Sequence, residues 1–391
     1  MSNEALLNRS VVVDAAVEAA GANEFGEDDW IEPLDRLIDS LLADAELNEI
    51  GGHVAQATLV SSLRARLQIL DWHARHPEVA ETPVAAPIVV LGQPRTGTTI
   101  LFDLLAQDPA LRAPLTWEVA EPIPPPRTET YLTDPRIEAA DASAGMAEAL
   151  TPGFQAIHPG GATRAQECVT IMAAAVRSIH YSIMFRVPTY TQWLFDEADP
   201  QPMYAIHRMF LQVLQSEHAG ERWVLKTPAH QWWLRELFRT YPDATAIHTH
   251  RDPLKVIAST ASLGASLRRL GMSDPSIADA GAEWSEYLIE GNERALRERT
   301  AGWLRDDQVI DVHFADLMAD TFGGLEQIYA QLGRPFTAEA EQAMRSFLAE
   351  NPSDKHGKHT YSFADTGLDV AATRARTARY TEHFGVATES V

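Results

Sequence analysis

The chain has 391 residues, and its 45% hydrophobic content is enough for a large buried core. A formal net charge of −23 excludes a general affinity for nucleic acids or acidic membrane surfaces, since both attract basic proteins. The absence of an apolar run of membrane-spanning length or a secretory signal, together with a single cysteine, predicts a cytoplasmic protein of one large or two smaller domains.

The N-terminal part of the chain is predicted to be helical. Apolar residues recur with helical spacing over residues 31–45 and 55–72, and the proline-flanked segment 77–87 is typical of a connector. We therefore predict a helical region over residues 1–84 that packs on a core formed by residues 85–391.

Residues Pro87 to Leu101, PIVVLGQPRTGTTIL, predict a buried parallel strand, a tight glycine-bounded loop and a helix that begins at Thr98. Free backbone N–H groups and the helix dipole would face the loop, which predicts an anion cradle. The spacing of the two glycines is that of a nucleotide P-loop, but Thr98 stands where an NTPase has its lysine. Because Arg95 is the only cation of the loop, the loop predicts a phosphate ester without a γ-phosphate.

The following part is predicted to be mainly helical, with a proline-rich loop at 121–127 and helices at 166–177 and 203–216. An aromatic-rich segment lies at 181–193. Together with Trp232 and Trp233, these aromatic residues would line an apolar pocket or belong to the core.

A second strand is predicted at Trp223–Lys226, where Pro228 then starts a helix. Only four of the 32 basic residues are lysines: Lys226, Lys255 and two residues near the C-terminus. Since the chain otherwise uses arginine, a lysine at a strand end is a candidate functional residue. A cation at the carboxyl edge of a parallel sheet lies where α/β proteins bind ligands. A salt bridge at the rim of the sheet is the alternative.

A third strand is predicted at 244–250, followed by a helix that Asp252 caps and Pro253 opens. Arg251 at the strand end and Ser259 about two turns into the helix would grip one phosphate together. The alternative is an ordinary strand–helix unit with an arginine at its tip.

The C-terminal part is predicted to hold a late strand at 309–314, helices at 322–332 and 338–349, and a loop at 353–369. The order of elements predicts an α/β fold with a P-loop-type parallel sheet flanked by helices.

Two motifs carry a resemblance to a known family. Pro94 to Thr99 fits the pattern P-[KR]-[ST]-G-[ST]-[ST], and Arg251 with Ser259 fits an Arg-x₇-Ser arrangement. Over residues 87–369 the chain thus resembles the sulfotransferases that use 3′-phosphoadenosine 5′-phosphosulfate (PAPS). With an arginine in the loop, the motif resembles that of the bacterial branch and that of the tyrosylprotein sulfotransferases. The resemblance implies PAPS as sulfuryl donor, no metal, and a hydroxyl or amine of a small-molecule or lipid acceptor.

The resemblance also implies roles for residues of this chain. Lys226, in a K-x-P-x-H segment similar to that of the bacterial branch, would stabilise charge on the sulfuryl group or the bridging oxygen. Arg95 would bind the donor and take part in catalysis. The remaining donor-binding residues implied are Thr96, Gly97, Thr98, Thr99, Arg251, Ser259 and Lys358.

Relatives with an arginine loop place their general base, a glutamate, just after the first helix, which implies Glu118 here. Partial desolvation beside Trp117 would raise the pKa of Glu118. His230 is the second candidate, as in the cytosolic branch, and Glu167 is the third.

Residues 353–369 resemble K-H-x-Y segments near the C-terminus of bacterial sulfotransferases and would form a lid, with Lys358 at the donor. A solvated basic loop is the alternative. The Arg-Lys-Gly motif of the cytosolic branch is absent, which leaves the adenosine contacts open.

Three other classes remain possible at this point. A P-loop kinase or NTPase would share the cradle, although it needs the missing lysine and Mg²⁺ ligands. A metal hydrolase would use His248 and His250, which alternate onto one strand face. A binding module would keep the cradle without turnover. The acceptor and the oligomeric state are open.

Overall fold

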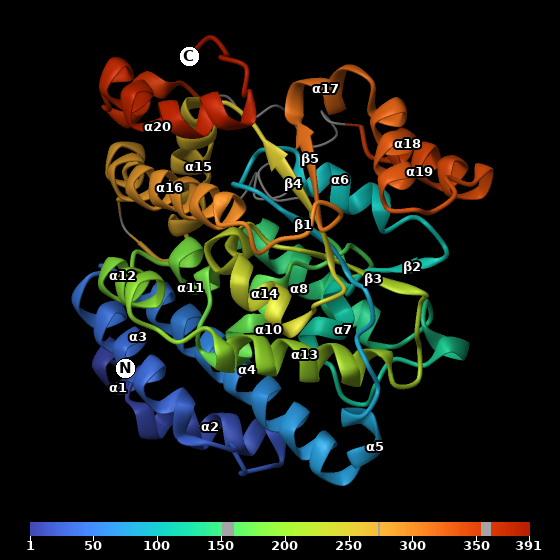
Figure 1. Cartoon of the computed structure of the whole chain (residues 1–391). Coiled ribbons are helices and arrows are strands. Elements are labelled where there is room, and N and C mark those ends of the chain that lie inside the picture. Colours follow the sequence, from blue (N-terminus) through green and yellow to red (C-terminus); the bar gives the residue numbers. More distant parts are fainter. Residues whose placement is uncertain (151–159, 273, 353–360) are drawn as a thin grey trace.

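A parallel sheet forms the centre of the computed structural model, which describes residues 1–150, 160–272, 274–352 and 361–391 (Figure 1). The strand order is β2-β3-β1-β4-β5, and all pairings are parallel. The strands are β1 (Ile88–Leu91), β2 (Leu111–Arg112), β3 (Arg222–Lys226), β4 (Thr245–His250) and β5 (Val309–His313). The predicted fold class and four predicted strands are confirmed, and β2 is an addition.

The central strand β1 is buried on both faces because helices cover both sides of the sheet. Val89 and Leu91 belong to one hydrophobic core, whereas Ile88 and Val90 belong to a second core on the other face. Val90 lies beside Lys226 of β3, so that the carboxyl ends of the two strands reach the same edge.

The N-terminal region is helical, as predicted. Its helices are α1 (Asn3–Leu6), α2 (Arg9–Ala20), η1 (Asp28–Trp30), α3 (Ile31–Ala43), α4 (Glu49–Arg75) and α5 (Pro77–Ala80). Leu34 of α3 and Leu63 of α4 share one core with Tyr181 and Tyr190 of the later chain. The N-terminal helices therefore pack on the rest of the protein, and the division at residue 84 itself stays a prediction.

The segment between β2 and β3 forms a helical layer. Its helices are α7 (Thr116–Ala120), η2 (Thr128–Thr130), α8 (Arg136–Leu150), α10 (Cys168–Met172), η3 (Ala173–Ala175), α11 (Ile179–Met184), α12 (Pro188–Asp196) and α13 (Gln201–Gln215). The helix predicted over 166–177 is shorter, because the backbone turns left-handed at Val176 with φ of 52°.

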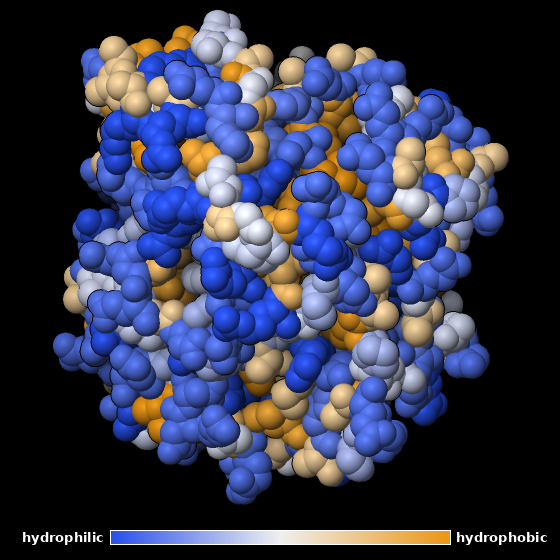
Figure 2. All heavy atoms as spheres, in the orientation of Figure 1, coloured by the Kyte–Doolittle hydropathy of each residue, from blue (hydrophilic) through white to orange (hydrophobic). Residues whose placement is uncertain are grey.

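The remaining helices surround the carboxyl edge of the sheet and its flanks. They are α6 (Thr98–Leu105), η4 (Pro228–Trp233), α14 (Leu234–Thr240), α15 (Pro253–Arg268), α16 (Ile277–Thr300), α17 (Phe314–Ala319), α18 (Thr321–Gln331), α19 (Ala338–Glu350), η5 (Phe363–Thr366) and α20 (Val370–Phe384). Within the described ranges, no helix combines the length and the apolar character needed to cross a membrane. Hydrophilic residues predominate on the face in Figure 2.

Candidate active site at the phosphate loop

The loop between β1 and α6 has the backbone geometry of an anion cradle. Arg95 and Gly97 adopt left-handed conformations, with φ of 67° and 92°. Alternation of this kind curves successive N–H groups toward one point. No side chain caps α6 at Gly97, so the N–H groups of its first turn keep their capacity for an anion. A Cβ atom at Gly92 would lie 2.5 Å from the carbonyl oxygen of Thr249, so only glycine fits this close approach.

Side chains of the loop fix it to its neighbours. Gln93 donates hydrogen bonds to the carbonyl of Leu288 at 2.8 Å and to Asn292 Oδ1 at 3.0 Å, both on α16. Thr96 donates to the carbonyl of Gln93 at 2.6 Å. Thr96 and Thr98 are buried, whereas Thr99 is exposed. Of the three predicted threonine ligands, Thr99 is thus the exposed one.

The second motif meets the loop although its serine is 164 residues away in sequence. Arg95 Nε donates to Ser259 Oγ at 3.1 Å, and Arg251 Nη1 donates to the carbonyl oxygen of Arg95 at 3.0 Å. The Arg251 guanidinium also lies 4.1 Å from the ring centroid of Phe314. The structure thus brings together Arg95, Arg251 and Ser259.

Lys226 joins the loop to a carboxylate. Its side chain is only 3% exposed, and Nζ donates to Thr99 Oγ1 at 3.1 Å and forms an ion pair with Glu167. A buried ammonium group requires such a partner. Lys226 does form a salt bridge, but its ammonium group is buried instead of standing at an exposed rim.

Glu167 is the carboxylate that the structure puts beside the loop. It precedes α10, and the preceding residues pair with the segment before α7 through Gln166 N and the carbonyl of Pro114 at 2.7 Å. Its side chain is 24% exposed. The sequence offered Glu167 only as the third candidate base, on the polarity of a helix face. A buried lysine needs a counter-ion, but the sequence does not say which acid supplies it.

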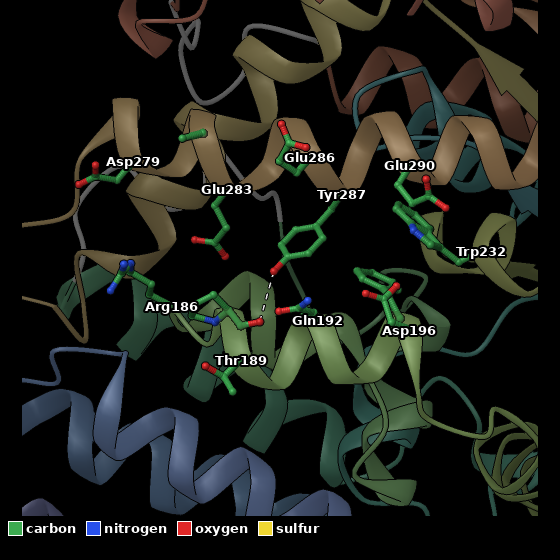
Figure 3. A pocket seen from close by; sticks show the side chains of 13 residues that line it. Arg186, Thr189, Gln192, Asp196, Trp232, Asp279, Glu283, Glu286, Tyr287 and Glu290 are labelled. Atoms are coloured by element: carbon green, nitrogen blue, oxygen red, sulfur yellow. Dashed lines mark hydrogen bonds between the residues drawn. The ribbon is translucent and has the colours of Figure 1, made fainter. Parts of the chain in front are cut away.

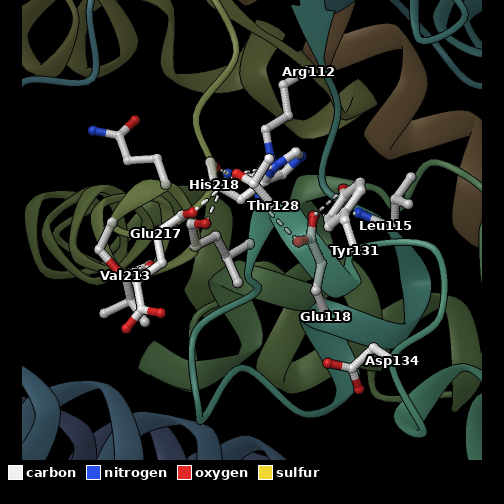
Figure 4. A network of polar contacts seen from close by, with 12 residues as sticks. Arg112, Leu115, Glu118, Thr128, Tyr131, Asp134, Val213, Glu217 and His218 are labelled. Carbon is white, nitrogen blue, oxygen red and sulfur yellow. Dashed lines mark hydrogen bonds and ion pairs between the residues drawn. The ribbon is translucent and has the colours of Figure 1, made fainter.

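Glu118 lies in a closed network of polar contacts (Figure 4). Its carboxylate accepts hydrogen bonds from Arg112 Nη2 at 2.7 Å, the backbone N–H of Leu115 at 2.8 Å and the hydroxyl of Tyr131 at 3.3 Å. The side chain is completely buried. Burial raises the pKa of Glu118, and the charge of Arg112 opposes this shift.

Arg112 belongs to the edge strand β2, which β3 separates from β1 and its loop. Arg112 pairs with Trp223, three residues before Lys226, and donates to the carbonyls of Leu214 and His218 ahead of β3. The loop instead follows the carboxyl end of β1. The oxygens of Glu118 are thus engaged by protein donors and enclosed, and its assignment as the base stays a prediction.

His230, the second candidate base, is also enclosed. Its Nδ1 lies 2.9 Å from the hydroxyl of Tyr204, and burial lowers its pKa well below the usual value. His230 forms a buried cluster of possible metal ligands with Cys168 and His207. The hydrogen bond and the ring contacts of His230 thus join it to Tyr204 and His207, and its assignment as the base stays a prediction.

His248 and His250 do share one face of β4, and they meet Asp311 in a second such cluster. Both oxygens of Asp311 are held by Arg299, at 2.7 and 2.8 Å. A guanidinium group thus already neutralises the carboxylate that a metal would need.

The predicted lid is only partly described, since Lys358 and the rest of residues 353–360 lie outside the described residues. Phe363 and Thr366, which follow, are buried.

A cavity of about 670 Å³ lies between α12 and α16 (Figure 3). Trp232 lines it and stacks on Phe195, with ring centroids 4.9 Å apart. Tyr181 and Tyr190 are fully buried in the core. Of the aromatic residues considered for an apolar pocket, some therefore line a cavity and others are structural.

Comparisons with known proteins agree with the resemblance that the two sequence motifs carry. Residues 87–338 match the model of a family described as the sulfotransferase family. The omega-hydroxy-beta-dihydromenaquinone-9 sulfotransferase Stf3 of Mycobacterium bovis is 26% identical over 291 residues, 71% of this chain and 70% of that protein. The crystal structure of sulfotransferase STF1 from Mycobacterium tuberculosis H37Rv has a TM-score of 0.84 at 32% identity, over 95% of this chain and 98% of that chain. Sulfotransferase STF9 from Mycobacterium avium has a TM-score of 0.88 at 31% identity, over 98% of both chains.

Proposed function

The chain belongs to the sulfotransferase family, and on that premise we propose that it transfers the sulfuryl group of PAPS to a hydroxyl group of a small-molecule or lipid acceptor. One observation carries the proposal. A buried lysine, Lys226, contacts the phosphate loop through Thr99 and a partly exposed carboxylate through Glu167. The cation for the leaving group (Lys226), the anion cradle and the candidate base (Glu167) thus lie close together.

The donor fits two groups of residues. The amides of the left-handed loop, the Thr99 hydroxyl and Lys226 suit the phosphosulfate end, while Arg95, Arg251 and Ser259 suit the 3′-phosphate. When bound, PAPS supplies the activated sulfuryl group. The alternative of a P-loop kinase or NTPase has no support from the family membership.

We assign the general base to Glu167 in place of Glu118. A carboxylate oxygen of Glu167 would take the proton of the acceptor hydroxyl, and Lys226 would stabilise the negative charge that develops on the leaving oxygen. In the donor-free protein the two side chains neutralise each other. Anionic oxygens over the loop would attract the ammonium group and leave the carboxylate free to accept a proton.

The proposal of a lipid-like acceptor rests on Stf3, whose name describes a hydroxylated menaquinone. That acceptor offers a hydroxyl, which is the group that a nearby carboxylate deprotonates.

The test uses purified protein, PAPS labelled in the sulfuryl group, and a panel of hydroxylated quinones, long-chain alcohols, sterols and phenols. Glu167→Gln should lower kcat by about 10²–10⁴-fold while the affinity for adenosine 3′,5′-bisphosphate stays within about twofold. Glu121→Gln, at a partly exposed ion pair with Arg64, serves as the matched control. Full turnover by Glu167→Gln would refute the role of Glu167 as the general base. If the protein consumed no PAPS with any acceptor of the panel, the proposed sulfuryl transfer would be refuted.

A further inference from the structure

The segment after α20 returns to the proposed donor site. Glu389 Oε1 accepts a hydrogen bond from Arg251 Nε at 2.9 Å, and Oε2 accepts one from Arg251 Nη2 at 3.0 Å. The third nitrogen of Arg251 contacts the carbonyl oxygen of Arg95 at 3.0 Å. Two parallel hydrogen bonds to a planar guanidinium are the arrangement in which arginine also binds phosphate.

Neighbouring residues anchor the backbone of this segment. The N–H of Glu389 donates to Asp252 Oδ2 at 2.6 Å, and its carbonyl accepts from Arg374 Nη2 at 3.2 Å. Arg374 in turn holds both oxygens of the fully buried Asp252, at 2.5 and 2.8 Å. Asp252 at the start of α15 and Arg374 near the start of α20 therefore hold the backbone of Glu389 beside Arg251.

The contact also changes Arg251 itself. Burial alone would lower the pKa of its guanidinium, but the hydrogen bonds and the charge of Glu389 outweigh burial and raise it. With side chains 15% and 32% exposed, the pair is partly shielded from water. Water and salt weaken such an ion pair less than a fully solvated one.

We propose that Glu389 is an internal occupant of the 3′-phosphate site, so that donor binding must displace this carboxylate from Arg251. The proposal rests on the proposed function, since it takes Arg251 as a ligand of the donor. A phosphate group brings more negative charge and more acceptor oxygens than a carboxylate, so it replaces Glu389 once the donor is present. The segment then acts as an autoinhibitory contact that weakens the apparent affinity for the donor and its desulfated product.

The size of the effect follows from the fraction of molecules in which Arg251 is free. The apparent dissociation constant equals the intrinsic constant divided by that fraction. A bidentate, partly buried pair that is closed in most molecules would weaken binding by about five- to thirtyfold.

The test compares Glu389→Gln with the parent and with Glu382→Gln, an exposed residue of α20 that removes the same charge away from Arg251. Binding of adenosine 3′,5′-bisphosphate is measured by calorimetry near neutral pH and low salt, and urea midpoints check that the variants are folded. Glu389→Gln should bind about five- to thirtyfold more tightly, and Glu382→Gln within about twofold of the parent.

Hydrogen exchange gives a second readout. In the parent, we expect the displaced carboxylate to carry the backbone of Glu389 away from Asp252, so the nucleotide should speed exchange at the amide of Glu389. Equal or weaker binding by Glu389→Gln, with a parent that binds, would overturn the proposal and give Glu389 a positioning role. If none of the three proteins binds the nucleotide, the assignment of the donor fails, and this proposal fails with it.

Discussion

Replacing Glu118 by glutamine removes the negative charge that neutralises Arg112 inside the protein. The Glu118 side chain is 0% exposed and that of Arg112 is 4% exposed, so water cannot take over the role of the lost carboxylate. Loss of one partner from a buried ion pair costs about 3–5 kcal/mol, because the other charge remains without compensation.

The remaining contacts place this substitution at the lower end of that range. Glutamine keeps an oxygen for the N–H of Leu115, and Arg112 keeps its hydrogen bonds to two carbonyls. The guanidinium also stays over the ring of Trp223, at 4.3 Å from its centroid. We expect Glu118→Gln to lower the free energy of unfolding by about 3 kcal/mol while turnover of the folded enzyme is retained.

The assay is urea unfolding followed by circular dichroism, together with kcat at saturating donor. Glu121→Gln is the matched control, since its pair with Arg64 at 2.7 Å has side chains 41% and 21% exposed. That substitution should cost no more than about 1 kcal/mol. A Glu118→Gln protein as stable as the parent but about 100-fold slower would refute this reasoning and restore Glu118 as the base.

Further predictions concern the loop, the metal requirement and acid stability. Lys226→Met should lower kcat by about 10²–10³-fold, because the leaving oxygen loses its cation, with nucleotide affinity by calorimetry within about threefold; an unchanged kcat would contradict this role. Ser259→Ala should weaken nucleotide binding by about 1 kcal/mol, roughly fivefold, since one neutral hydrogen bond is lost; equal affinity would remove Ser259 from the site. Turnover should not change with EDTA, because fixed cations neutralise the leaving phosphate, and an activity restored by Mg²⁺ would argue against this. Burial lowers the pKa of His207 to about 3, whereas the pKa of a histidine in the unfolded chain is about 6.5. The unfolded state thus binds more protons between these values, and the free energy of unfolding falls as the pH drops from about 6.5 toward 3. Urea midpoints should show a loss of about 1 kcal/mol from this imidazole between pH 7 and 5.5, and His207→Gln should have a shallower slope.

Local patterns were sufficient for the elements that hold the phosphate loop. The apolar run Ile88–Leu91, the bracketing glycines and the helix start at Thr98 depend on neighbouring residues, and all three were predicted correctly. The strand that ends at Lys226 and the helix cap at Asp252 are local in the same sense.

The choice among carboxylates was not readable from local patterns. Glu118 lies within the short helix α7, and Glu167 directly precedes the short helix α10. What distinguishes them is their cationic partner, Arg112 for Glu118 and Lys226 for Glu167. The contact of Glu389 with Arg251 joins residues 138 positions apart. Strand β2 has only two residues, too few for a periodic pattern.

The core that the N-terminal helices share with the rest of the chain bears on where this protein begins and ends as a folding unit. The family model matches residues 87–338, yet Leu59 and Leu63 of α4 are fully buried in the common core. At the other end, Arg374 of α20 neutralises Asp252 at the start of α15. A protein cut to the matched span would keep the whole loop and would expose one side of its core. The span that the family model matches is thus shorter than the part of the chain that must fold together.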